Sequence, residues 1–182
     1  MSTRASADDP PRRAMRWGLF ALGTLAILAF VPLAGPIQKL VREAIGEGGL
    51  RWGMAGLVAV AAVTVVGKAR RRSDLSPGRL ACALLVPALA VALMVKLSIV
   101  AEAFHLVEYG LLGVLAFRAL SCHLHEPAVY FAAAALTALV GTCDELVQWL
   151  TPGRYWGLRD VGLNAAGAVL AQLWIVVLRP AE

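Results

Sequence analysis

The residues best suited to chemistry lie in one short segment, which contains Glu102, His105, Glu108 and Tyr109. They follow one another closely enough that a helix places them on one face, because residues three and four apart are neighbours on a helix surface. Such side chains could transfer protons, bind a ligand or hold a metal ion. The segment opens an apolar run from Ala103 to Leu120. A charged side chain at the centre of a membrane helix costs about 2.5–3.5 kcal/mol on insertion, so these residues need a reason to be there.

A second polar group lies near the end of the apolar run from Ala128 to about Leu150. It consists of Asp144, Glu145 and Gln148, whose separations of three and four residues again match one helix face. These side chains could form a functional site, or they could pair with one another to hold the helices together. Interhelical polar contacts in lipid average only about 0.6 kcal/mol, which makes so many ionisable groups an inefficient way to stabilise a bundle. We therefore favour a functional site.

A turn and a third polar group follow directly. The segment 151–154, Thr-Pro-Gly-Arg, is typical of a turn. The last apolar run is then preceded by Arg159 and Asp160, with Asn164 four residues after Asp160. Arg154 and Arg159 either neutralise neighbouring carboxylates or bind an anionic ligand such as a lipid phosphate, and each arginine could take one role. Asn164 is either part of the site or a hydrogen-bonding contact between helices.

The composition shows what kind of protein must position these groups. Of the 182 residues, 59% are hydrophobic and 16% are charged, whereas ordinary soluble domains are about 45–50% apolar and about 25% charged. This balance excludes a soluble enzyme domain and a disordered chain. The net charge of +5 does not indicate a nucleic-acid partner, because the basic residues flank apolar runs and no aromatic platform is interleaved with the basic run at 68–72. The three cysteines have neither disulfide nor metal spacing.

We predict an all-α fold, a polytopic membrane bundle of about six transmembrane helices with short loops. The apolar runs are long enough to span a bilayer and lack the alternation of barrel strands. The six predicted spans are Trp17–Leu33, Arg51–Gly67, Leu80–Val95 (with an extension to Val100 left open), Ala103–Leu120, Ala128–Leu150 and Val161–Leu178.

The remaining segments are a tail and an amphipathic stretch. A basic N-terminal tail, residues 1–16, precedes the first span. Between the first two spans, Pro36–Glu47 carries an amphipathic stripe that ends at glycines 46, 48 and 49. This pattern predicts either a helix lying in the membrane interface or an ordinary helical loop packed on the bundle.

The distribution of Lys and Arg predicts the orientation. With six spans and a cytoplasmic N-terminus, eleven of the seventeen basic residues lie on the inner side and six on the outer side. This bias favours a multi-pass protein of the plasma (inner) membrane with both termini in the cytoplasm. The fourth span then starts outside, the fifth ends outside and the sixth starts outside. The three polar groups are therefore expected to meet at the outer face of the membrane.

The polar residues, read in order, resemble the VanZ-like membrane protein family. The resemblance rests on Glu102-x-x-His105-x-x-Glu108-Tyr109, then Asp144-Glu145-x-x-Gln148, then Pro152-Gly153-Arg154-x5-Asp160-x-x-x-Asn164. It covers residues 80–178, which implies a four-helix VanZ-like domain preceded by residues 17–79 with two spans, an interfacial helix and a basic loop. Glu102 stands where the family often has Lys. The family is linked by name to low-level teicoplanin resistance, so the resemblance implies an envelope function rather than a particular reaction.

Three functions are compatible with these residues. The first is binding of a lipid-linked or anionic amphiphilic ligand, with membrane lipids as partners. The second is a membrane-embedded hydrolase or transferase in which His105 acts with Glu108, Asp144 or Glu145. The third, a transporter, is the least favoured because no inverted repeat is evident. We expect no cofactor and no metal, since no metal-binding spacing such as HExxH is present. The candidate ligand-binding residues are Glu102, His105, Glu108, Tyr109, Asp144, Glu145, Gln148, Arg154, Asp160 and Asn164.

Overall fold

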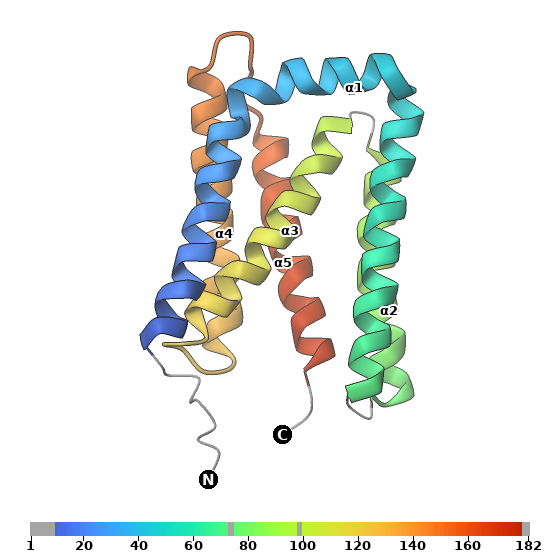
Figure 1. The fold of residues 1–182 in the computed structure, drawn as a ribbon, viewed down its shortest axis with the longest axis vertical. Helices are drawn as coiled ribbons and strands as arrows, with labels where there is room; N and C mark the ends of the chain where they lie inside the picture. Colours follow the sequence, from blue (N-terminus) through green and yellow to red (C-terminus); the bar gives the residue numbers. More distant parts are fainter. Residues whose placement is uncertain (1–9, 73–74, 98–99, 180–182) are drawn as a thin grey trace.

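The computed structural model describes residues 10–72, 75–97 and 100–179 (Figure 1). Within these ranges the chain forms five helices and no strands. The helices are α1 (Pro10–Arg72), α2 (Pro77–Lys96), α3 (Val100–Leu120), α4 (Ala128–Leu150) and α5 (Leu158–Leu178). All five are long and apolar enough to cross a membrane, which confirms the prediction of an all-α membrane bundle.

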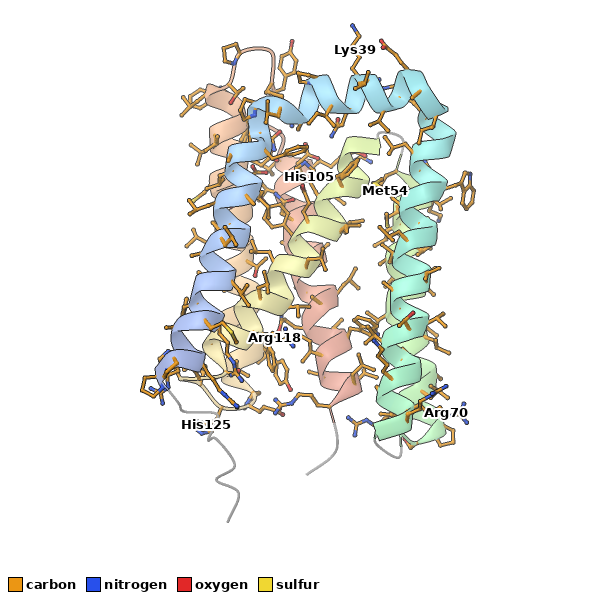
Figure 2. The ribbon with its side chains drawn as sticks, in the orientation of Figure 1. Lys39, Met54, Arg70, His105, Arg118 and His125 are labelled. Atoms are coloured by element: carbon orange, nitrogen blue, oxygen red, sulfur yellow. The ribbon has the colours of Figure 1, made fainter. Side chains whose placement is uncertain are left out.

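The number of helices is five rather than six because α1 contains both N-terminal spans. Figure 1 shows α1 following the bundle to one end, running across that end, and returning along the other side. The helix is interrupted at Gly46, which has a φ of 71°, a conformation that glycine adopts without steric cost. Pro32 and Pro36 also lie inside α1, where a proline removes a backbone hydrogen bond and favours a bend. The predicted amphipathic segment 36–47 belongs to the crossing part, on which Figure 2 labels Lys39.

The helix ends differ from the predicted ones in ways that affect the site. α4 has its predicted bounds, whereas α3 and α5 each begin three residues earlier than predicted. Glu102 and Asp160 consequently lie in the first turns of α3 and α5, where the positive end of the helix dipole favours a carboxylate. At the N-terminus, α1 begins at Pro10, so part of the predicted tail is helical; residues 1–9 lie outside the described ranges.

The packing of α3 on α5 depends on small residues. A Cβ added at Gly167 of α5 would lie 2.8 Å from the Leu106 carbonyl oxygen of α3, so the two backbones approach more closely than a side chain allows. Nearby, Gln172 Nε2 donates a hydrogen bond to the Gly113 carbonyl oxygen over 3.0 Å. These contacts fix the relative position of α3, which carries His105, and α5, which carries Asp160.

The ends of the helices place the three polar groups together. α1 begins and α5 ends at one end of the bundle, and the turn between α4 and α5 lies at the other (Figure 1). In Figure 2, His105 lies below the crossing part of α1, far from Arg118 and His125 at the opposite end. The start of α3, the end of α4 and the start of α5 therefore share one end. The side of the membrane that this end faces stays a prediction.

Candidate functional site

Gln148 is the centre of a hydrogen-bond network at the end of α4. Its Nε2 donates to Asp144 Oδ2 and to Glu145 Oε1, both over 3.0 Å. Its Oε1 accepts a hydrogen bond from Arg154 Nη2 over 2.7 Å. An amide has donors on one side and an acceptor on the other, so a glutamine can hold two carboxylates and one guanidinium at the same time. This arrangement explains why the glutamine follows the two acids at three and four residues.

Glu145 is held from both sides and faces His105. Its Oε2 accepts a hydrogen bond from the Gly157 backbone N–H over 3.2 Å, and its Oε1 lies 3.9 Å from His105 Nε2. His105 is 7% exposed, and its Nδ1 has no hydrogen-bond partner among the described residues. One donor atom each from His105, Glu145 and Asp160 lie within 4.8 Å of one another. These three residues come from α3, α4 and α5, and they are the group best placed to hold a metal ion.

The two arginines have different partners. Arg159 Nη1 lies 2.9 Å from Glu102 Oε1; the Arg159 side chain is 61% exposed and that of Glu102 is 7% exposed. Arg154 makes no ion pair within residues 10–72, 75–97 and 100–179, and its hydrogen bond goes to the neutral amide of Gln148. Of the two roles predicted for this pair, Arg159 therefore neutralises a carboxylate, whereas Arg154 interacts electrostatically with Glu108, Asp144 and Glu145 without forming an ion pair with any of them.

A cavity of about 120 Å³ lies between this network and α1. Its polar lining comes from His105, Glu108, Asp144, Gln148 and Arg154, together with Gln38 of α1. Its apolar lining comes mostly from α1, with Ile27, Phe30, Val31, Ala34, Ile37 and Val41. One wall of the cavity can therefore contact an apolar group while the other contacts a polar or charged one.

Buried oxygen atoms without partners surround the network. Glu102 Oε2, Asp144 Oδ1 and Asp160 Oδ1 are buried and have no hydrogen-bond partner in the described part of the chain. The Tyr109 hydroxyl lies close to Asp144 without the geometry of a hydrogen bond. Buried polar groups are usually satisfied, so these oxygen atoms are short of hydrogen-bond donors among the described residues.

All ten predicted residues lie at this end of the bundle, but they do different things. Asn164 Nδ2 donates to the Gly141 carbonyl oxygen over 3.2 Å, which makes Asn164 a contact between α5 and α4. Glu102 is committed to Arg159, and Tyr109 is fully buried. The others line the cavity or belong to the Gln148 and His105 groups.

Sequence reasoning missed three features of the site. It did not identify the apolar wall supplied by α1, because a helix that covers a site looks like any other apolar span. It did not identify Gly157, whose N–H donates a hydrogen bond to Glu145. A Cβ at this position would lie 2.9 Å from Asp160 Oδ2. The sequence feature that could have indicated Gly157 is a glycine directly before a helix. It did not bring His105, Glu145 and Asp160 together as one group, because these residues lie on three separate helices and match no local spacing pattern.

In the comparison with protein families, the family model described as VanZ/LLP1 matches the chain over residues 19–179. The match begins in the first part of α1 and so includes both N-terminal spans, which the motif resemblance left outside. Comparisons with curated proteins and with solved structures gave no significant match.

Proposed function

Because the chain belongs to the VanZ/LLP1 family, we propose that it is a cell-envelope membrane protein that binds the anionic headgroup of an amphiphilic, lipid-linked ligand. The observation that carries this proposal is the position of Arg154, which makes no ion pair with any residue that the structure describes and lies in a cavity with one polar and one apolar wall. In the proposed orientation both termini are cytoplasmic, and the cavity opens near the outer leaflet of the plasma membrane.

Arg154 has the chemistry that a phosphate or carboxylate requires. A guanidinium has five N–H donors in a planar fork, and hydrogen bonding to Gln148 uses one donor group. The remaining donors can bind an oxyanion through two parallel hydrogen bonds, which a lysine ammonium cannot reproduce. The Pro152-Gly153 turn directly before Arg154, with Gly153 at a φ of 77°, fixes the backbone that presents it.

The apolar wall supports an amphiphilic ligand over a free anion. α1 places Phe30, Val31 and Ile37 against the same cavity that Arg154 lines. The cavity volume of about 120 Å³ suits a headgroup rather than a whole lipid, so the acyl or prenyl chains of the ligand would extend into the bilayer. Membrane lipids are the immediate source of such molecules.

Binding can be tested with the purified full-length protein in detergent, using phosphatidic acid as the probe. We expect Arg154→Lys to weaken binding about ten- to a hundredfold, since hydrogen bonds to charged groups contribute about 1.5–3 kcal/mol. The matched control is Arg159→Lys, which should bind like the wild type because Arg159 is committed to Glu102. Inorganic phosphate as competitor separates recognition of a lipid from recognition of phosphate alone. Equal binding by both variants and the wild type would refute the proposal.

The link to glycopeptide tolerance is part of the same proposal. A protein that holds a lipid-linked envelope precursor, or an amphiphilic glycopeptide itself, would alter sensitivity to teicoplanin. We expect cells that express Arg154→Lys to lose most of this tolerance at unchanged abundance of the protein in the membrane. A phenotype that merely follows abundance would show that Arg154 acts only in folding.

A second candidate function is a membrane-embedded hydrolase or transferase. The approach of His105 to Glu145, 3.9 Å, favours it because the two could form an acid–base pair. Release of inorganic phosphate from phosphatidic acid by the wild type, abolished in His105→Gln, would support this function over simple binding.

A further inference from the structure

His105, Glu145 and Asp160 each supply one donor atom, and these atoms lie within 4.8 Å of one another at the meeting point of three helices. We propose that they form a binding site for a divalent cation such as Zn²⁺ or Mn²⁺. One imidazole and two carboxylates are a ligand set that these ions accept, and three protein ligands leave a position open for water or for an oxygen atom of a ligand.

The separations of the donor atoms are close to those in a metal site. Protein ligands lie about 2.0–2.2 Å from Zn²⁺, so two ligands of a tetrahedral ion are about 3.3–3.5 Å apart. His105 Nε2 and Glu145 Oε1 are 3.9 Å apart. Small rotations of the side chains are therefore enough to bring the donor atoms to coordinating distance.

The imidazole of His105 is an independent indication of a ligand. It is 7% exposed, its Nδ1 is buried without a hydrogen-bond partner in the part of the chain that the structure describes, and its Nε2 lies 3.9 Å from Glu145 Oε1. A buried polar group without a partner is unfavourable, and buried imidazoles normally find one. Nε2 faces Glu145 at a distance too long for a hydrogen bond but suitable for a shared ion.

The neighbours of the three donors behave like the outer shell of a metal site. Both oxygens of Glu145 accept hydrogen bonds, one from Gln148 and one from the Gly157 N–H. Carboxylates that bind metals are usually oriented in this way by further hydrogen bonds. The orphaned Asp160 Oδ1 and Asp144 Oδ1 belong to the same group of helix ends and would also be stabilised by a nearby cation.

The charges at this end also favour a cation. Four carboxylates, Glu108, Asp144, Glu145 and Asp160, lack an ion pair with Lys or Arg in the described ranges, while Arg154 is the one guanidinium hydrogen-bonded within their network. A divalent ion would offset this excess of negative charge. It would also allow an anionic ligand to approach, since the phosphate could bind the ion and Arg154 together. This last step rests on the proposed function, whereas the metal site itself does not.

Metal binding can be measured directly on the full-length protein, purified in detergent with an affinity tag that lacks histidine. After treatment with a chelator, the protein is equilibrated with Zn²⁺ or with Mn²⁺, and bound metal is quantified by elemental mass spectrometry. We expect one ion per chain for the wild type with at least one of the two metals. His105→Gln, Glu145→Gln and Asp160→Asn should each lose at least tenfold in affinity.

Two matched controls separate this site from adventitious binding. Glu102→Gln removes a carboxylate from the same end that is paired with Arg159, and His123→Gln removes a histidine from the loop after α3. Both should bind metal like the wild type. Metal should also raise the melting temperature of the wild type and of Glu102→Gln by several degrees, which gives a second readout if a variant of the three donors folds poorly. The inference would be overturned if the wild type binds no metal and shows no metal-dependent melting shift. It would also be overturned if the variants of His105, Glu145 and Asp160 bind metal like the wild type.

The failure of this inference can be distinguished from failure of the proposed function. If phosphatidic acid binds in the presence of chelator and depends on Arg154, with no metal bound under any condition, the metal site is refuted and the lipid function stands. If one metal ion binds through the three donors but no lipid phosphate binds, the lipid function is refuted and the metal site stands.

Discussion

The contact between Gly141 of α4 and Asn164 of α5 joins two helices that carry most of the site, and enlarging Gly141 tests its importance. A Cβ at position 141 would lie 2.6 Å from Asn164 Cβ. Carbon atoms normally pack about 3.5–4.0 Å apart. Gly141→Ala must therefore separate the helices by about 1 Å at this point, because rotation of the Asn164 side chain does not move its Cβ, and this separation also lengthens the Asn164 hydrogen bond to the Gly141 carbonyl oxygen.

The expected loss of stability follows from three contributions. Overpacking costs about 1–3 kcal/mol, and a buried amide left without its hydrogen bond costs about 1–3 kcal/mol. Replacing glycine by alanine inside a helix stabilises the folded state by about 0.5–1 kcal/mol. Since a helix separation of about 1 Å weakens the hydrogen bond without exposing the amide, the overpacking cost dominates, and we expect a net destabilisation of about 1–3 kcal/mol. For a chain of this size, that corresponds to a fall in melting temperature of about 3–10 °C.

The assay is thermal unfolding of the purified protein in detergent, followed by tryptophan fluorescence. The matched control is Gly162→Ala in α5, where an added Cβ meets nothing within 4 Å. This variant should melt at or slightly above the temperature of the wild type. If Gly141→Ala and Gly162→Ala have the same melting temperature, close packing at Gly141 does not hold α4 against α5, and the reasoning is refuted.

Three further predictions concern topology and hydrogen bonding. In a variant without its native cysteines, Thr151→Cys should react with a membrane-impermeant maleimide in intact cells; reaction only after lysis would contradict the proposed orientation. Gln148→Leu removes the partner of two buried carboxylates and of Arg154, so it should lower the free energy of unfolding by about 2–5 kcal/mol. Gln172→Leu loses one neutral hydrogen bond to Gly113 and should cost about 0.5–1.5 kcal/mol, as measured by the same unfolding assay; equal losses in the two glutamine variants would contradict the central role of Gln148.

The fold was largely predictable because membrane spans have a strong sequence signal. A run of apolar residues long enough to cross a bilayer can only be helical, so α4 was placed at its observed bounds. The starts of α3 and α5 were predicted too late, since Glu102 and Asp160 interrupt the apolar pattern that marks a span. In the structure both acids are helical, because a first turn favours carboxylates. The amphipathic stretch between the first two spans was expected to end at glycines 46, 48 and 49, and α1 does leave helical geometry at Gly46.

The sequence could predict at which end of the bundle the site lies, but not which side chains contact one another there. Span counting alone brings His105, Glu145 and Asp160 to one end of the bundle, because it depends only on which end of each helix a residue occupies. Side-chain pairing depends on the rotation of each helix and on the path of the turn after α4, and neither is encoded in a local spacing. Arg154 and Arg159 could therefore not be told apart from sequence. The structure distinguishes them by one contact each, a carboxylate for Arg159 and a neutral amide for Arg154. Under the proposed function, the Arg154 guanidinium is therefore the group that an anionic ligand would contact, and Arg159 is not.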